Sequence, residues 1–132
     1  MLDPKLLTNL PDDPDVIAPD GSEIRLIKSP VPSSSMVHVL LHQGTTTHAV
    51  YHVTVEEQWL CVAGEGELWK KDKKTESITK LRAGVKCNIP LRTIFQFRST
   101  GNTALEIILK TTPPWPGETE AVRVKGKWKP RI

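Results

Sequence analysis

The segment from Gly44 to Gly66 reads GTTTHAVYHVTVEEQWLCVAGEG, and it decides the fold class of this chain. It is rich in β-branched and aromatic residues and ends in a glycine-flanked turn, a composition typical of short strands and the turn that follows them. Three polar side chains able to do chemistry, His48, His52 and Glu57, lie among its apolar residues. The segment therefore predicts β-structure that carries polar groups into the fold.

Similar strand-like stretches lie on both sides of this segment. They are short, they alternate apolar and polar residues, and turn residues separate them. With the segment itself they give eight or nine strands, including 35–42, 47–55, 57–62, 67–71, 77–81, 85–89, 94–98 and 103–110. No stretch shows sustained helical periodicity. The chain is therefore predicted to be all-β, as a sandwich, a jelly roll or a small barrel.

The composition is that of one ordinary globular domain. The chain has 132 residues, 38% hydrophobic and 25% charged, enough for one core and few for two. The net charge of +3 is too small to predict a nucleic-acid partner, and no apolar run approaches the roughly 18 residues of a membrane helix. Two cysteines, Cys61 and Cys87, are too few for a disulfide scaffold, and no targeting segment is evident. We expect a cytoplasmic protein with no nucleic-acid and no membrane partner.

Proline placement suggests three parts. Of the 11 prolines, only Pro90 lies between residues 33 and 112, so we expect an N-terminal arm at 1–20, a hydrogen-bonded barrel at 21–112 and a C-terminal Pro/Trp arm at 113–132. The first arm is acidic and the last is basic. Either both arms are solvated, or they pair within a protomer or across a dimer, and Trp115 and Trp128 favour some docking.

Two segments resemble the motifs of the cupin superfamily. One is Gly44 to Gly66, and the other, at 84–99, reads GVKCNIPLRTIFQFRS. The matching positions are Gly44, His52, Glu57 and Gly64 in the first motif, and Gly84 and Pro90 in the second. The resemblance implies a cupin double-stranded β-helix, a small jelly-roll barrel, over roughly residues 20–112. It also implies a homodimer, since cupins commonly dimerise.

Only two of the four positions that bind a metal ion in cupins hold a ligand residue in this sequence. In the family, two histidines and a glutamate of the first motif and a histidine of the second usually share one ion. The matching residues here are Val50, His52, Glu57 and Phe95. A protein metal site needs at least three or four N, O or S ligands, and this set offers two. His48 lies four residues along the strand from His52, about 13 Å away. The sequence therefore favours a protein without a metal cofactor.

Three interpretations of His52 and Glu57 stay open. The favoured one is a metal-free polar pair that binds a small organic ligand or performs acid/base catalysis of the isomerase, cyclase or lyase type. The second is half of a divalent metal site (Fe, Mn, Ni or Zn) in an enzyme such as a dioxygenase, completed by His48, His38, water or substrate. The third is a buried hydrogen-bonded pair in a non-catalytic binding or structural module. The sequence does not separate an enzyme from a binding protein.

Period-two alternation predicts a pocket around this pair. The candidate lining residues are His48, Val50, Trp59, Phe95 and Phe97, with Arg92 at the rim as a candidate for an anionic group. An apolar, aromatic wall with one convergent polar pair is typical of small-molecule sites. The alternative is that the aromatic side chains fill the core of a small barrel and leave no cavity.

Overall fold

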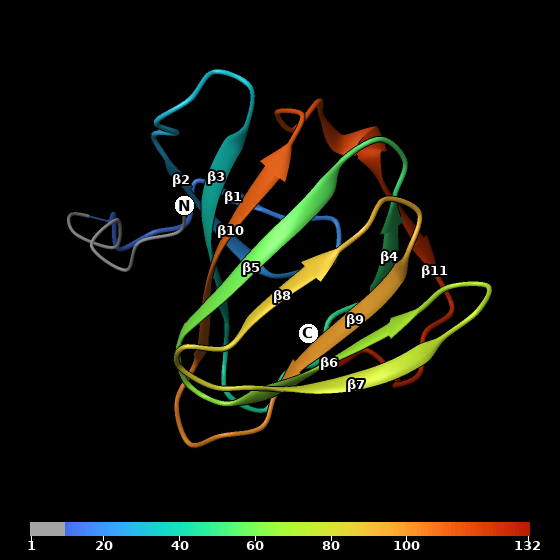
Figure 1. Ribbon diagram of the computed structural model, residues 1–132. Helices are drawn as coiled ribbons and strands as arrows, with labels where there is room; N and C mark the ends of the chain where they lie inside the picture. Colours follow the sequence, from blue (N-terminus) through green and yellow to red (C-terminus); the bar gives the residue numbers. More distant parts are fainter. Residues whose placement is uncertain (1–9) are drawn as a thin grey trace.

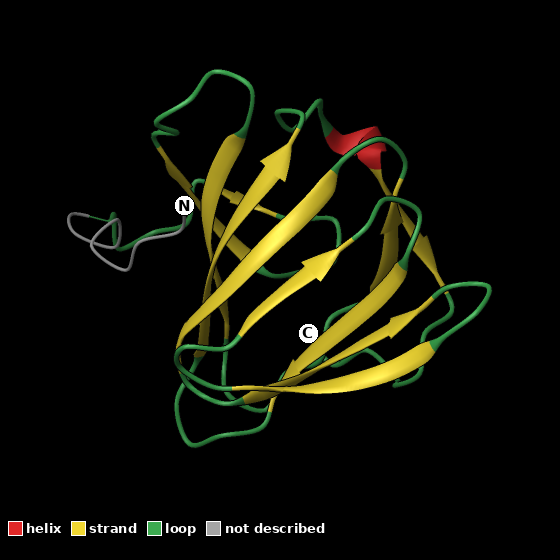
Figure 2. Ribbon diagram, in the orientation of Figure 1, coloured by secondary structure: helices red, strands yellow, loops and turns green. Residues whose placement is uncertain are grey.

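The computed structural model describes residues 10–132, which form two antiparallel β-sheets that face each other (Figure 1). The strands are β1 (Val16–Ile17), β2 (Glu23–Ile27), β3 (Ser35–Leu41), β4 (Ala49–His52), β5 (Glu56–Ala63), β6 (Gly66–Lys71), β7 (Glu76–Leu81), β8 (Lys86–Ile89), β9 (Ile94–Ser99), β10 (Leu105–Thr112) and β11 (Ala121–Val124). A six-stranded sheet has the order β1-β2-β3-β10-β5-β8, and a five-stranded sheet has the order β11-β4-β9-β6-β7. A short 3-10 turn, η2 (Glu118–Glu120), precedes β11 and is the red element of Figure 2.

This architecture confirms the all-β fold class and the two-sheet barrel predicted from the sequence. Every stretch expected to be a strand contains one. Three further strands, β1, β2 and β11, were not predicted. The first has two residues and the last has four, so their backbones depend on pairing with a neighbouring strand rather than on a local sequence pattern. The described residues contain no helix long and apolar enough to span a membrane.

The space between the sheets is filled at one end and hollow at the other. Leu41 of β3 and Leu105 and Ile107 of β10 are at most 1% exposed and belong to the apolar core. Further along the same strands, Val37 of β3 and Leu109 of β10 line a cavity instead. Both strands therefore contribute to the packed core with one half and to the cavity wall with the other.

The described parts of both ends of the chain belong to the barrel. β11 adds to the five-stranded sheet beside β4, with Ala121 opposite His52. The Nε atom of Arg123 donates a hydrogen bond to the carbonyl oxygen of Pro19 at 2.7 Å, and Thr46 forms an antiparallel bridge with Arg131. The described part of the C-terminal segment thus contacts the barrel, and the hydrogen bond of Arg123 joins it to the N-terminal segment. Residues 1–9 of the expected N-terminal arm lie outside the described part.

Candidate functional site

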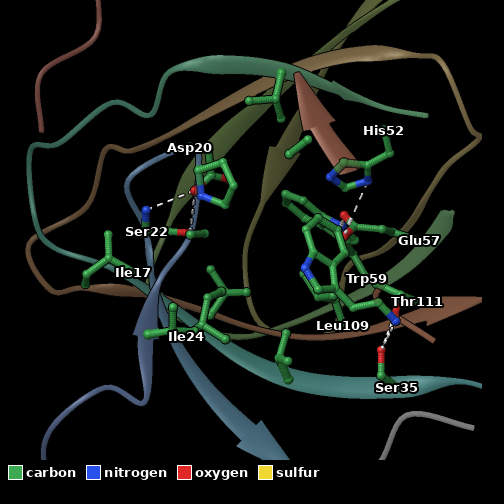
Figure 3. Close-up of a pocket in the computed structure, with 18 of the residues that line it drawn as sticks. Ile17, Asp20, Ser22, Ile24, Ser35, His52, Glu57, Trp59, Leu109 and Thr111 are labelled. Carbon is green, nitrogen blue, oxygen red and sulfur yellow. Dashed lines mark hydrogen bonds and ion pairs between the residues drawn. The ribbon is translucent and has the colours of Figure 1, made fainter. Parts of the chain in front are cut away.

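A cavity of about 820 Å³ lies between the two sheets. Its volume falls within the range of about 300–1,000 Å³ that is usual for small-molecule sites. Most of the wall is apolar, and Figure 3 shows side chains from both sheets around the opening. Trp59, Phe95 and Phe97 stack edge to face, with centroids of Trp59 5.9 Å from Phe95 and 5.0 Å from Phe97. These aromatic rings therefore form part of a wall and leave space in front of it.

The four positions that carry the family's metal ligands all lie on this cavity. Val50, His52, Glu57 and Phe95 line it together. Val50 of β4 is paired with Phe95 of β9, and the rings of His52 and Phe95 lie 5.2 Å apart. The fold thus brings the four positions together, but two of them hold side chains without a ligand atom. In residues 10–132 no three His, Cys, Asp or Glu side chains gather closely enough to hold a metal ion. This donor set does not fit the family's metal centre.

His52 and Glu57 face each other from two consecutive strands. β4 ends at His52, and Glu57 is the second residue of β5. His52 Nδ1 lies 3.7 Å from Glu57 Oε2, which is longer than a hydrogen bond. The other oxygen, Oε1, accepts a hydrogen bond of 2.9 Å from the indole nitrogen of Trp59. His52 Nδ1 is buried and has no hydrogen-bond partner among the described residues. The two side chains therefore lie close together without a hydrogen bond between them.

Burial shifts the two groups in opposite directions. It lowers the pKa of His52 from 6.5 to about 4, although the negative charge of Glu120 acts the other way. It raises the pKa of Glu57 from 4.5 to about 8, helped by the charge of Asp20 and opposed by the hydrogen bond from Trp59. Both shifts follow because an apolar environment disfavours the charged form. At neutral pH the carboxyl group of Glu57 holds its proton and the imidazole of His52 is neutral.

Glu120 supports the turn that joins these two strands, and sequence reasoning did not find it. Its carboxylate accepts hydrogen bonds from the backbone of Thr54 at 2.7 Å, the hydroxyl of Thr54 at 2.6 Å and the backbone of Val55 at 2.9 Å. Burial opposes ionisation, but these hydrogen bonds lower the pKa of Glu120. The carboxylate fixes the turn between His52 and Glu57. No local pattern links Glu120 to a turn 65 residues earlier.

Trp115 completes the cavity wall from the C-terminal segment. Its ring lies 5.1 Å from that of His52 in an edge-on arrangement, and its backbone N–H donates to Ser35 Oγ at 2.9 Å. Ser35 Oγ is in turn hydrogen-bonded to Thr111 Oγ1 (Figure 3). The expectation that this tryptophan docks rather than remaining on a free arm agrees with its place here.

Two residues expected around the pocket, His48 and Arg92, are absent from its lining. The alternation that placed His48 beside Val50 does not apply, because β4 begins only at Ala49. Arg92 is exposed and lies in the turn before β9 with a φ of 61°. This left-handed conformation favours glycine. The backbone N–H of Arg92 donates to the carbonyl oxygen of His52 at 2.8 Å, so Arg92 supports the strand end through its main chain.

The remaining candidates for a metal ligand or a pocket group lie elsewhere. His38, on the outer face of the six-stranded sheet, contacts Glu106 at 2.9 Å between Nε2 and Oε1. Several cavity residues come instead from segments that the sequence did not connect with the site. These are Val16, Ile17, Asp20, Ser22, Ile24, Leu26, Thr111, Ala121 and Arg123. They come mostly from the strands that were not predicted and from loops, and only the tertiary structure brings them to the cavity.

No protein-family model and no curated protein matches this sequence. Solved structures do resemble it. Pac13 from Streptomyces, described as a nucleoside dehydratase, superposes with a TM-score of 0.63 at 17% identity, over 80% of each chain. CapF from Staphylococcus aureus, a capsular polysaccharide assembling protein, gives 0.65 at 17% identity over 80% of this chain and 32% of its own. The coconut allergen cocosin gives 0.66 at 19% identity over 78% and 29%. All three are cupin-type structures, and this chain has the cupin fold that its two sequence motifs implied.

Proposed function

We propose that this chain is an enzyme that moves protons on a small, uncharged organic molecule in the cavity, with His52 and Glu57 as its acid/base pair. The observation that carries the proposal is the burial of this pair in the cavity wall. At neutral pH Glu57 has a proton to give, and His52 has a lone pair to accept one. Such opposite protonation preferences in adjacent groups are typical of general acid/base catalysis.

A lyase-type reaction uses both groups at once. His52 takes a proton from a carbon atom of the substrate, a C=C bond forms, and the C–O bond on the next carbon breaks. The leaving hydroxyl takes the proton of Glu57 and departs as water. His52 is then a cation and Glu57 an anion, with 3.7 Å between Nδ1 and Oε2, so transfer of the proton to Glu57 restores the starting state. Because His52 is a weak base, the C–H bond must be acidified by a neighbouring carbonyl group.

Two features of the cavity support an uncharged, ring-containing ligand. The rings of Trp59, Phe97 and Trp115 line the wall and offer flat apolar surface. Arg123 is the only basic residue among the lining residues described, and its Nε already binds the Pro19 carbonyl. A phosphate or carboxylate group would therefore meet a single guanidinium group. Structures of Pac13 contain uridine, which makes a nucleoside the first ligand class to test.

We propose that this chemistry needs no metal cofactor. Two of the four metal-binding positions are Val50 and Phe95, and apolar side chains cannot coordinate an ion. His52 and Glu57 remain free to exchange protons, which a bound cation would prevent. The competing interpretation, a metal-dependent enzyme, requires at least one further ligand beside this pair, and neither His38 nor His48 lines the cavity.

The test is turnover or isotope exchange at the bound molecule. The protein is incubated in D₂O with uridine and related nucleosides, and with uncharged β-hydroxy aldehydes and ketones. Mass spectrometry follows loss of water or uptake of deuterium at carbon. We expect one of these compounds to react with the wild type, and the reaction to be lost in His52→Gln and Glu57→Gln. The control is His38→Gln, on the outer face of the sheet.

Binding is measured in parallel by the ligand-induced shift in melting temperature. A compound that raises the melting temperature but neither exchanges deuterium nor loses water would show a binding protein and contradict the catalytic proposal. Tighter binding of uridine 5′-phosphate than of uridine would contradict the preference for an uncharged ligand.

A further inference from the structure

A second polar group lies across the cavity from His52 and Glu57. Figure 3 shows Asp20 and Ser22 on one side of the cavity and the pair on the other. Asp20 belongs to the loop between β1 and β2, and its side chain is buried, with 9% of the residue exposed. The catalytic scheme above gives it no role. We propose that Asp20 is a binding residue that accepts a hydrogen bond from a hydroxyl group of the ligand, opposite the acid/base pair.

The loop that presents Asp20 is fixed from several directions. The backbone of Ala18 donates to the Ser22 carbonyl, and the backbone of Gly21 donates to the Ala18 carbonyl, both at 2.9 Å. Gly21 has a φ of 100°, a conformation that favours glycine. The carbonyl of Asp20 itself accepts a hydrogen bond of 3.0 Å from the backbone of His48. A group held in this way is preorganised for a ligand and loses little conformational entropy on binding.

One oxygen of the carboxyl group is used by the loop, and the other is left for a ligand. Oδ1 of Asp20 accepts hydrogen bonds from the backbone N–H of Ser22 at 2.9 Å and from its hydroxyl at 2.7 Å. Within residues 10–132, no hydrogen bond to Oδ2 is formed. The turn needs only one acceptor, which the amide of an asparagine would also supply. Among the described residues the second oxygen is therefore left without a hydrogen bond, on a side chain that lines the cavity.

Keeping a carboxyl group at this place costs free energy. Burial raises the pKa of Asp20, although the hydrogen bonds from Ser22 and the charges of His48 and Arg123 oppose the shift. A polar oxygen in a mostly apolar wall gains stability from a hydrogen-bond donor, and a donor on the ligand would supply it. A hydroxyl group is an uncharged donor and so suits a wall that is otherwise mostly apolar. A hydroxylated ligand would thus be bound at Asp20 and would expose its reacting atoms to His52 and Glu57.

This inference rests on the proposed function in its choice of a nucleoside as the probe. Binding of uridine and of its 2′-, 3′- and 5′-deoxy analogues is measured by calorimetry for the wild type and for Asp20→Asn. The asparagine keeps the acceptor that the turn uses and replaces the free oxygen with an NH₂ donor. The matched control is Asp72→Asn, because Oδ1 of Asp72 likewise accepts from the backbone of its own turn, at Lys74 and Thr75, but on an exposed hairpin.

We expect Asp20→Asn to bind uridine about tenfold to a hundredfold more weakly than the wild type, because the hydroxyl group of the ligand would lose its acceptor and face an NH₂ group instead. For the wild type, the affinity for one deoxy analogue should be lower than that for uridine by a similar factor. The variant and the wild type should bind this analogue with equal affinity. Asp72→Asn should bind like the wild type. The melting temperature of Asp20→Asn should be no lower than that of the wild type, since the turn is kept and a buried acid is removed.

The inference is overturned if Asp20→Asn binds uridine like the wild type, if it weakens uridine and all three analogues equally, or if the wild type binds none of the four compounds. The catalytic proposal fails separately. Loss of uridine binding in Asp20→Asn, together with no deuterium exchange by the wild type on any bound compound, would keep the Asp20 site and reject the acid/base role of His52 and Glu57.

Discussion

Two histidine–glutamate pairs, one on the outer face of the six-stranded sheet and one in the cavity, differ in the burial of the glutamate and in the contact between the two side chains. His38 and Glu106, on the outer face, are 2.9 Å apart; the His38 side chain is 3% exposed and the Glu106 side chain is 33% exposed. His52 and Glu57, in the cavity, are 3.7 Å apart, and each side chain is only 6% exposed. Solvent reaches the side chain of Glu106, whereas burial raises the pKa of Glu57 and lowers the pKa of His52. Residue type alone therefore does not define an acid/base pair, because the environment sets which form is present.

The largest expected effect is on turnover, which should depend on the cavity pair and not on the outer pair. Once a reacting compound is found, His52→Gln and Glu57→Gln should each lower kcat by about 10²- to 10⁴-fold, the usual contribution of a general acid or base. Rates are measured by mass spectrometry at saturating substrate. His38→Gln should change kcat by no more than about threefold. A loss of kcat as large as in the two cavity variants would show that the pairs do not differ in catalysis.

The second prediction asks whether the cavity pair is half of a metal site. Val50→His/Phe95→His restores the four ligand types of the family at positions that already line one cavity. We expect this variant to bind a divalent ion such as Zn²⁺ or Ni²⁺ stoichiometrically, as measured by elemental mass spectrometry after dialysis, since four N and O ligands suffice. Stoichiometric metal in the wild type, purified without chelators, would contradict the metal-free proposal. A melting curve of the variant confirms that it is folded.

The third prediction concerns stability against pH. The pKa of Glu57 is about 8 in the folded protein against an ordinary value of 4.5, so between these values the folded state binds more protons than the unfolded state. Its contribution to the free energy of unfolding therefore falls as pH rises from about 4.5 to about 8, by a few kcal/mol. The pKa of His52 is lowered to about 4, so its contribution falls as pH drops from 6.5 to about 4.

Urea denaturation at several pH values tests both signs. Glu57→Gln should keep stability above pH 8 that the wild type loses, and His52→Gln should flatten the loss below pH 6.5. Identical pH dependence in Glu57→Gln and the wild type would show that Glu57 is not the group that titrates.

The smallest expected effect is at the outer pair. Glu106→Gln keeps an oxygen acceptor opposite His38 and changes only the more exposed partner of the pair, so the loss should be about 1 kcal/mol or less. We expect a change of this size in the free energy of unfolding, measured by urea denaturation at pH 7, and no change in turnover. A loss of several kcal/mol would show that the outer pair stabilises the fold as strongly as a buried network does. The outer pair and the cavity pair would then not differ in this respect.

The sequence predicted the elements whose pattern is local. Alternation identified the strands that carry Val50, Trp59 and Phe97, and motif spacing alone singled out His52 and Glu57 as the polar pair. All five line the cavity. Local alternation works here because successive side chains of a strand point to opposite faces, so one known inward residue orders its neighbours.

The tertiary structure decided what lies across the cavity from that pair and what holds it. Asp20, Trp115 and Glu120 come from loops and a C-terminal segment whose place depends on pairing between distant strands, such as β11 with β4. The same limit explains His48 and Arg92, which precede their strands and so do not follow the alternation within them. The sequence by itself determined the strands and the identity of one polar pair, because these follow from periodicity and spacing. Only the tertiary structure decided that the pair faces an open cavity with Asp20 on its far side, because burial and distance depend on contacts between residues far apart in the chain.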